Sequence, residues 1–178
     1  MKLIRPDAYF VSVLDIRPED LIERGIRGVI LDLDNTLLPR TMDTVPEQIA
    51  DWVFLLEEAG LQVVVVSNNF HERGVRAAAS IGAEFVGKAM KPFRRGLLSA
   101  CERMNLAPSE VLCVGDQTYT DILGAHLCGM QAWLVQPLVK QDLKHTKLLR
   151  VVDRIALRGM KPEGGSMPVF DIRGEHSK

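Results

Sequence analysis

The sequence predicts a doubly wound parallel α/β sheet in three layers, and two observations carry this prediction. Short runs rich in β-branched and aliphatic residues recur along the chain, as expected of strands that are covered on both faces. Single helix-like patterns separate these runs. Strands that alternate with single helices favour right-handed βαβ units, so we expect helices on both faces of one parallel sheet.

The expected strands and helices follow from apolar runs and from the residues that start and stop helices. The best strand candidates are residues 28–34, 62–67 and 111–115, and weaker ones are 84–87 and 132–135. Helices are expected at 46–59, 70–81, 92–104 and 121–128. Pro46 suits a first helical turn, and Gly60, Gly82 and Gly129 follow the expected helix ends.

Four segments are expected along the chain. Residues 1–25 form a lead packed on the core, and 26–136 form the catalytic core. Residues 137–160 contain a basic amphipathic helix at 141–158, and 161–178 form a Gly/Pro-rich tail expected to be disordered. That helix suits either an anionic membrane surface or packing of its apolar stripe on the sheet.

The composition excludes several classes of protein. The 178 residues carry a net charge of −1, so no whole-protein affinity for nucleic acid is expected. Three cysteines without paired spacing predict neither a disulfide framework nor a zinc site. Without an apolar leader or a membrane-spanning run, we expect a cytoplasmic protein whose membrane contact, if any, is peripheral at the inner face.

Polar residues directly follow each of the three best strands. Such residues are unusual in a buried sheet, which is otherwise apolar. Because the carboxyl ends of parallel strands meet at one edge, these residues are expected to lie together. A single aspartate after a strand is often only a helix cap, so the coincidence of three clusters carries the inference. The clusters are Asp32, Asp34 and Thr36, then Ser67, Asn68 and Asn69, then Asp116 and Asp121.

Converging carboxylates repel one another unless a cation lies between them. Oxygen ligands without histidine or cysteine favour a hard ion, and Mg²⁺ fits this set better than zinc does. The sequence does not separate Mg²⁺ from Mn²⁺. A bound divalent cation would also let a phosphate dianion approach this acidic edge.

Four motifs in this order resemble those of the haloacid dehalogenase (HAD) superfamily of aspartate-nucleophile phosphohydrolases. They are DLDNT at 32–36, Ser67 followed by Asn68, Lys91 before Pro92, and GDQTYTD at 115–121. The resemblance implies a HAD-like Rossmannoid fold and a phosphatase that acts through an aspartyl-phosphate.

The resemblance also implies a role for each matching residue. Asp32 would be the nucleophile, and Asp34 would be the general acid and base. Thr36 would support the loop and help to bind phosphate, as would Ser67 and the Asn68 backbone N–H. Mg²⁺ would be bound by Asp32, the Asp34 carbonyl, Asp116 and Asp121, the last directly or through water.

The phosphate-binding lysine has two candidates. Lys91 enters a helix through a Lys-Pro step, as in the family pattern, whereas Lys88 directly follows a strand and has the surroundings of a solvated side chain. We favour Lys91, although spacing alone does not exclude Lys88.

The segments between the motifs are too short for a cap domain, so an open site is expected unless the tail or an oligomer covers it. The arrangement is most similar to the capless subfamily IIIA phosphatases, particularly the YqeG-like bacterial group, over about residues 3–155. That group is similar in turn to the phosphatidylglycerophosphate phosphatases of mitochondria and plastids. The resemblance implies a phospholipid-precursor substrate.

Other functions compete with this interpretation. The chain could hydrolyse a small soluble metabolite or nucleotide, or keep the fold as a binding or scaffold protein. A response-regulator receiver also combines acidic residues and a lysine, but its acidic pair and its phosphorylated aspartate lie on different strands. Here both carboxylates of the first motif follow one strand, which argues against a receiver.

Overall fold

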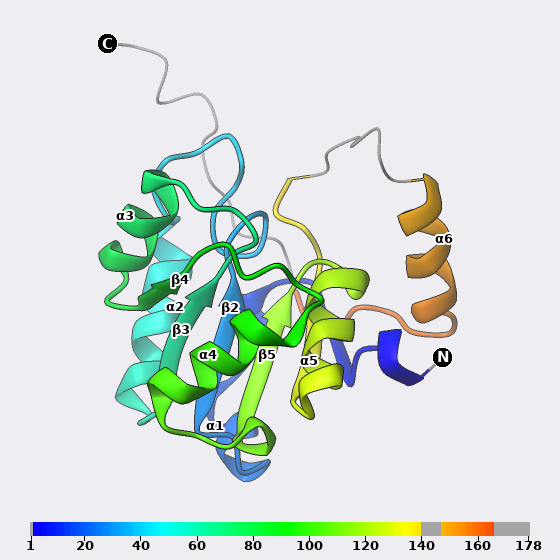
Figure 1. Cartoon of the computed structure of the whole chain (residues 1–178), viewed down its shortest axis with the longest axis horizontal. Coiled ribbons are helices and arrows are strands. Elements are labelled where there is room, and N and C mark those ends of the chain that lie inside the picture. Colours follow the sequence, from blue (N-terminus) through cyan, green and yellow to red (C-terminus); the bar gives the residue numbers. More distant parts are fainter. Residues whose placement is uncertain (1, 140–146, 166–178) are drawn as a thin grey trace.

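A six-stranded, all-parallel sheet forms the centre of the computed structural model, which describes residues 2–139 and 147–165 (Figure 1). The strand order is β1-β6-β5-β2-β3-β4. The strands are β1 (Ala8–Phe10), β2 (Gly28–Asp32), β3 (Gln62–Val66), β4 (Glu84–Val86), β5 (Val111–Gly115) and β6 (Gln131–Val135). The predicted doubly wound parallel fold is confirmed.

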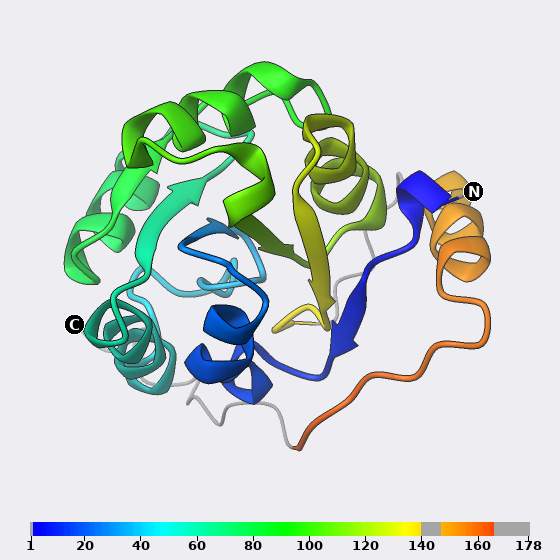
Figure 2. The same cartoon turned by 90° about the horizontal axis from the view of Figure 1, so that it is seen from below.

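Helices cover both faces of this sheet. The helices are α1 (Pro18–Glu23), α2 (Glu47–Glu58), α3 (Glu72–Ser80), α4 (Arg94–Met104), α5 (Leu123–Cys128) and α6 (Lys147–Ala156). Figure 2 shows α4 and α5 on one side and α1, α2 and α3 on the other. No helix among the described residues is both long and apolar enough to span a bilayer.

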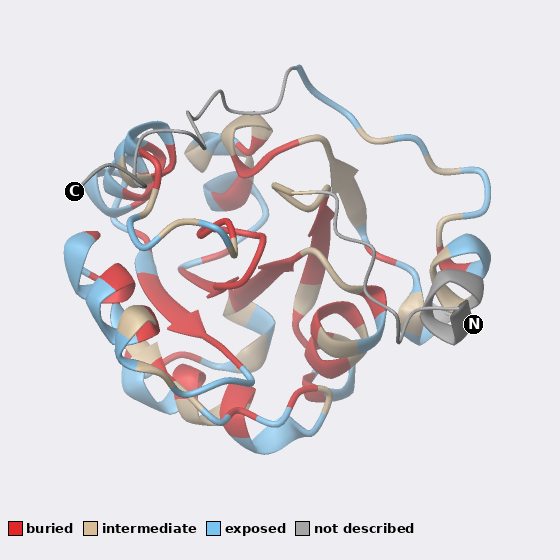
Figure 3. Ribbon diagram, turned by 90° about the horizontal axis from the view of Figure 1, so that it is seen from above, coloured by how far each residue is buried: buried red, intermediate tan, exposed pale blue. Residues whose placement is uncertain are grey.

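Alternate residues of each strand serve two separate hydrophobic cores. In β2, Val29 and Leu31 face the core made with α1, α2 and α3, and Ile30 faces the core made with α4 and α5. All three are fully buried. Figure 3 shows the strands largely buried and the outer helix faces exposed. Two-sided burial explains why these strands are apolar almost throughout.

Strand β1 is an element that the sequence analysis did not predict. The N-terminal segment contributes this three-residue strand at the edge of the sheet, paired with β6. Chain from far along the sequence then lies beside β1, because the Val11 N–H donates to Glu163 O and the Glu163 N–H donates to Tyr9 O, both at 2.8 Å.

Other element boundaries differ from the prediction by a few residues. Strands β2 and β3 end at Asp32 and Val66, so Asp34 and Ser67 lie in the loops that follow. The helix expected at 121–128 begins with a π-helical turn at Thr118–Ile122, followed by α5. A wide turn of this kind is common at functional sites.

Helix α6 is the described part of the expected basic helix. It lies beside the N-terminal end of the chain in Figures 1 and 2, and the Arg5 guanidinium donates to Arg158 O at 3.0 Å. The Thr118 hydroxyl donates to the Asp153 carboxylate, and Ala156 is buried. The helix thus packs on the fold through its described part. Residues 140–146, and residues 166–178 of the tail expected at 161–178, lie outside the described residues.

The chain order positions the functional edge. From β2 the chain builds β3 and β4 on one side, and it returns to place β5 on the other side of β2. Loops therefore diverge between the carboxyl ends of β2 and β5, which is where doubly wound sheets bind ligands. Within the described ranges, the connections from β2 to α2 and from β3 to β4 hold no inserted domain.

Gly96 in α4 supports the loop before it, and replacing it should destabilise the protein. A Cβ at Gly96 would lie 2.5–2.7 Å from the Cα, Cβ and O atoms of Ala89. We expect Gly96→Ala to lower the free energy of unfolding in urea by about 1–3 kcal/mol, because helix and loop must move apart. Glu102→Ala on the same helix is the control, with a change within about 0.5 kcal/mol. Equal effects of the two substitutions would contradict this account.

Candidate active site

Lys91 is the centre of a buried ion cluster at the carboxyl edge of the sheet. Its ammonium donates to Asp32 Oδ1 at 2.6 Å, to Asp121 Oδ1 at 2.7 Å and to Val66 O at 3.1 Å. Lys91 is 5% exposed, and Asp32 and Asp121 are 7% and 1% exposed. Charges this deep in a protein require close partners, which these distances provide.

Three carboxylates surround the single ammonium. Oxygen atoms of Asp32, Asp116 and Asp121 lie within 4.8 Å of one another. Asp32 Oδ2 and Asp116 Oδ1 are buried and have no hydrogen-bond partner among the described residues. The cluster thus has more carboxyl groups than ammonium groups, together with oxygen atoms available to a ligand. An all-oxygen donor set of this kind fits a hard divalent cation.

The electrostatics of the cluster follow from its burial. Desolvation raises the pKa of Asp32 to about 7, against the opposing effect of the Lys91 ammonium. Burial, with the Asp32 and Asp121 charges, also raises the pKa of Asp116 well above its ordinary value. Desolvation disfavours the charged form of Lys91, but the Asp121 and Asp32 carboxylates outweigh it and raise its pKa. Lys91 therefore remains an ammonium at neutral pH.

A close backbone approach allows Asp121 to reach the cluster. A Cβ on Gly115, the last residue of β5, would lie 2.4 Å from the Asp121 carboxyl group. The Gln117 N–H donates to Asp121 Oδ2 at 3.1 Å and fixes the second oxygen of this carboxylate. Only glycine at the end of β5 leaves room for this arrangement.

Asp34 has surroundings different from those of Asp32. The turn after β2 is held by the Asn35 N–H, which donates to Leu38 O at 2.9 Å, and Asn35 has a φ of 67°. Asn69 Nδ2 donates to Asp34 Oδ2 at 3.2 Å, and the Arg73 guanidinium lies 3.8 Å from Asp34 Oδ1. The two carboxylates of the first motif therefore have separate partners.

The two loops that flank the cluster are tied together by Asn68. Its side chain accepts from the Lys91 N–H at 2.6 Å and donates to Lys91 O at 3.0 Å. Ser67 Oγ accepts from the Asn69 N–H at 3.1 Å. This pairing fixes the Lys91 backbone, so that the ammonium is aimed at the carboxylates.

The structure brings the sequence-predicted residues to one edge of the sheet. A pocket of about 180 Å³ is lined by Asp32, Asp34, Arg40, Ser67, Asn68, Asn69, Lys91, Gln117 and Thr120. Thr36 is buried behind the first turn, and its hydroxyl has no partner among the described residues. Lys88 lies outside this pocket, with its ammonium 5.7 Å from the centre of the Phe70 ring.

A bacterial relative identifies the family of this fold and acidic edge. The chain is 33% identical over 163 residues to "Probable phosphatase YqeG" of Bacillus subtilis (strain 168), covering 92% of this chain and 95% of that protein. The chain belongs to the YqeG-like phosphatases of the HAD superfamily. The prediction that it is an enzyme, a HAD-type phosphatase, is confirmed.

Further comparisons agree with the HAD assignment. A model of haloacid dehalogenase-like hydrolases matches residues 47–129, and a model of mitochondrial PGP phosphatases matches residues 1–82. The chain is 29% identical over 188 residues to phosphatidylglycerophosphate phosphatase 1, chloroplastic/mitochondrial, of Arabidopsis thaliana, covering 91% of this chain but only 51% of that protein.

Solved structures support the HAD fold. The cobalt-bound deoxy-D-mannose-octulosonate 8-phosphate phosphatase of Haemophilus influenzae has a TM-score of 0.53 at 15% identity, covering 75% of this chain and 88% of that one. A HAD family hydrolase of Streptomyces avermitilis has a TM-score of 0.51 at 18% identity, covering 70% and 71%.

Two arginines at this HAD site were missed by sequence reasoning. Arg73 donates to Pro39 O at 2.7 Å and to Met42 O at 2.8 Å, and so holds the loop after the first motif. Arg40 lines the pocket, and its buried Nε has no partner among the described residues. Arg40 directly follows the stretch LLP after the first motif, but no pattern in the sequence distinguishes it from a solvated arginine.

The raised pKa of Asp32 predicts how a divalent cation stabilises the protein. The ordinary pKa of an aspartate is 3.8, whereas burial raises the pKa of Asp32 to about 7 in the fold. Between these values the cation-free fold holds a proton that the unfolded chain has lost, so its stability falls as pH rises through this window. A cation binds the ionised carboxylates, so it stabilises the folded protein most at pH values above this window.

We therefore expect the increase in Tm from excess MgCl₂ over EDTA to be small near about pH 5.5 and to reach about 5 °C or more near about pH 8. Asp116→Asn should abolish this increase, and the exposed Asp51→Asn should keep it. Thermal unfolding at matched ionic strength measures both. An increase that is independent of pH, or one that Asp116→Asn retains, would contradict the cation site.

Proposed function

We propose that the chain is a Mg²⁺-dependent phosphomonoester hydrolase that forms an aspartyl-phosphate on Asp32, and that its substrate is phosphatidylglycerophosphate. The observation that carries the proposal is the buried contact of Lys91 with both Asp32 and Asp121 beside unpartnered carboxylate oxygens. This arrangement pairs a nucleophile with positive charge where a phosphoryl group would enter. A phosphatase of the HAD superfamily needs both.

The site is suited to hold a divalent cation between three carboxylates. Asp32, Asp116 and Asp121 would bind it, together with the Asp34 carbonyl. When bound, the cation offsets the negative charge of the phosphoryl oxygens beside these carboxylates. Mg²⁺ is the proposed ion because it keeps waters and accepts few protein ligands.

The first step transfers the phosphoryl group to the protein. A carboxylate oxygen of Asp32 attacks phosphorus, the bond from phosphorus to the ester oxygen breaks, and Asp34 protonates the departing alkoxide. The Lys91 ammonium, fixed by three hydrogen bonds, stabilises the negative charge that surrounds the transferring group. Ser67 and the Asn68 backbone N–H are placed in this proposal as donors to phosphoryl oxygens.

The second step releases inorganic phosphate. Asp34, now a carboxylate, takes a proton from water, the water oxygen attacks phosphorus, and the bond from phosphorus to Asp32 breaks. Asn69 and Arg73 contact the Asp34 carboxylate and so keep it oriented for both transfers. The cycle returns Asp32 ionised and Asp34 protonated.

Two observations support a phospholipid precursor as the substrate. The matching family model and the Arabidopsis relative are both named for PGP phosphatases. Arg40 adds a second cation at the pocket that contains Asp32 and Lys91. Phosphatidylglycerophosphate carries a phosphodiester beyond its terminal phosphate, and an arginine is the side chain best suited to bind this second anion.

Trapping the intermediate tests the reaction. Asp32→Asn should reduce hydrolysis of an aryl phosphate by at least about a thousandfold, because the nucleophile is lost. Asp34→Asn should accumulate the phosphoryl-enzyme, because a phenolate leaves without a proton whereas water needs the base. Intact mass after an acid quench measures the added phosphoryl group. Asp51→Asn should behave as wild type, and absence of a phosphoryl adduct in Asp34→Asn would argue against the covalent route.

A substrate series tests the lipid assignment. Short-chain phosphatidylglycerophosphate should have a higher kcat/KM than nucleotides and sugar phosphates. Arg40→Ala should lower that kcat/KM by about ten- to a hundredfold while changing aryl phosphate hydrolysis by less than about threefold, because only the lipid carries the second anion. Arg76→Ala, an exposed arginine on α3, is the control. Equal losses on both substrates, or preference for a sugar phosphate, would contradict the assignment.

A further inference from the structure

Large apolar side chains are exposed around the loops that carry the phosphatase residues. Phe70, Met90 and Phe93 are 60%, 63% and 68% exposed. Phe70 follows Asn69 of the pocket, and Met90 and Phe93 flank Lys91 in the sequence. Clustered exposed apolar side chains are uncommon on proteins that have no partner, and they mark interaction sites.

The backbone of the loop between β4 and α4 holds Met90 and Phe93 outward. Lys91 and Ala89 are buried, Ala89 against Gly96, while Met90 between them is exposed. Lys88 and Met90 have φ values of 52° and 56°, a backbone conformation that side chains other than glycine rarely adopt. Because Asn68 also fixes the Lys91 backbone, the apolar side chains are presented by an anchored loop.

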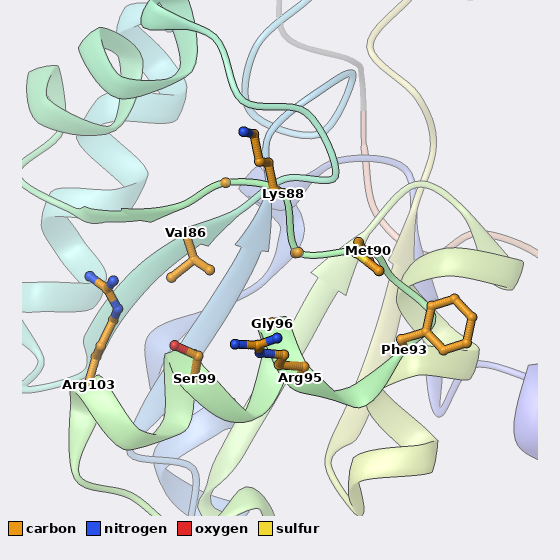
Figure 4. Close-up of a pocket in the computed structure, with 10 residues that line it drawn as sticks. Val86, Lys88, Met90, Phe93, Arg95, Gly96, Ser99 and Arg103 are labelled. Atoms are coloured by element: carbon orange, nitrogen blue, oxygen red, sulfur yellow. The ribbon is translucent and has the colours of Figure 1, made fainter.

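Basic side chains accompany the apolar ones. A pocket of about 370 Å³ is lined by Val86, Gly87, Lys88, Ala89, Met90, Phe93, Arg95, Gly96, Ser99 and Arg103, with no acidic residue among them. Figure 4 shows Met90 and Phe93 on the loop, and Arg95, Ser99 and Arg103 along α4. Arg103 pairs with Glu84 at 2.9 Å, whereas Lys88 and Arg95 form no ion pair within the described ranges.

We propose that the face formed by Phe70, Lys88, Met90, Phe93 and Arg95, here called the loop face, docks on an anionic phospholipid bilayer. Met90 and Phe93 enter the interfacial layer, and Lys88 and Arg95 contact the headgroup phosphates. Exposed apolar side chains beside Lys88 and Arg95, on a pocket whose lining holds no carboxylate, have the chemistry of this partner. A neutral surface would leave the charges unmatched, and an acidic surface without apolar groups would leave Met90 and Phe93 unmatched.

Docking at this face goes beyond the catalytic steps and would serve them. Lys91 lies between Met90 and Phe93 in the chain and points inward to Asp32. A phosphoryl group on a lipid headgroup at the bilayer surface would therefore lie next to the loop that binds it. Burial of each large apolar side chain is worth roughly ten- to a hundredfold in a partition constant.

Vesicle sedimentation of the full chain tests the proposal. We expect wild type to sediment with phosphatidylcholine vesicles that contain phosphatidylglycerol and not with phosphatidylcholine alone. Met90→Ser with Phe93→Ser, and separately Lys88→Glu with Arg95→Glu, should each lower the partition coefficient about tenfold or more. Phe54→Ser, which replaces a 59% exposed phenylalanine on α2, should bind as wild type. Hydrolysis of a soluble aryl phosphate should be unchanged in the Met90/Phe93 and Phe54 variants, which shows that they fold.

Several outcomes would overturn the proposal that the loop face docks on a bilayer. These are no sedimentation of wild type with anionic vesicles, normal sedimentation of both double variants, or an equal loss of sedimentation in Phe54→Ser. If the Arg154→Glu, Ile155→Ser double variant lost sedimentation with anionic vesicles and the Met90→Ser, Phe93→Ser double variant kept it, the membrane contact would belong to α6. That result would also overturn the proposal. Sedimentation without hydrolysis of any phosphate ester would count against the proposed function and leave the docking intact.

Discussion

The structure depends on one electrostatic constraint, which is that a lysine and two aspartates are buried together at the end of a parallel sheet. Each of these charges would be costly alone, and their contacts of 2.6 and 2.7 Å offset that cost only if the backbone holds them in place. The surrounding architecture meets this need. Strand β2 supplies Asp32, the loop before α4 supplies Lys91, and the absence of a side chain at Gly115 admits Asp121. The excess of carboxylate over ammonium then suits the cluster to the proposed cation.

The loop that carries Lys91 has two proposed functions, because its side chains alternate between inside and outside. Its inward residues complete the ion cluster and pack on α4, and its outward residues form an apolar and basic surface. The proposed catalytic and docking roles therefore depend on the same few peptide units. A change that loosens the loop would affect both, whereas a change of an outward side chain affects the surface alone. This separation is what makes the two roles open to independent experiments.

Much of this arrangement could be predicted from the sequence, for identifiable reasons. Strands β2, β3 and β5 are buried on both faces, so each has a continuous apolar run that ends in polar residues. The three-residue β1 was missed because it is short and only partly buried, so its apolar residues do not stand out from those of a loop. The positions of Arg40 and Arg73 could not be predicted, because both depend on how the loop after the first motif folds back. The choice of Lys91 over Lys88 came from a family pattern, and roles for these residues remain proposals.

The pairing of β1 with Glu163 has a consequence for how the molecule behaves in a crowded solution. An edge strand presents unpaired N–H and C=O groups, which can template the addition of strands from other molecules. Here the two hydrogen bonds between Glu163 and the β1 segment occupy part of that edge with the molecule's own chain. The stretch after α6 thus covers part of this edge, and shortening the chain before Glu163 would expose these backbone groups to pairing with another molecule.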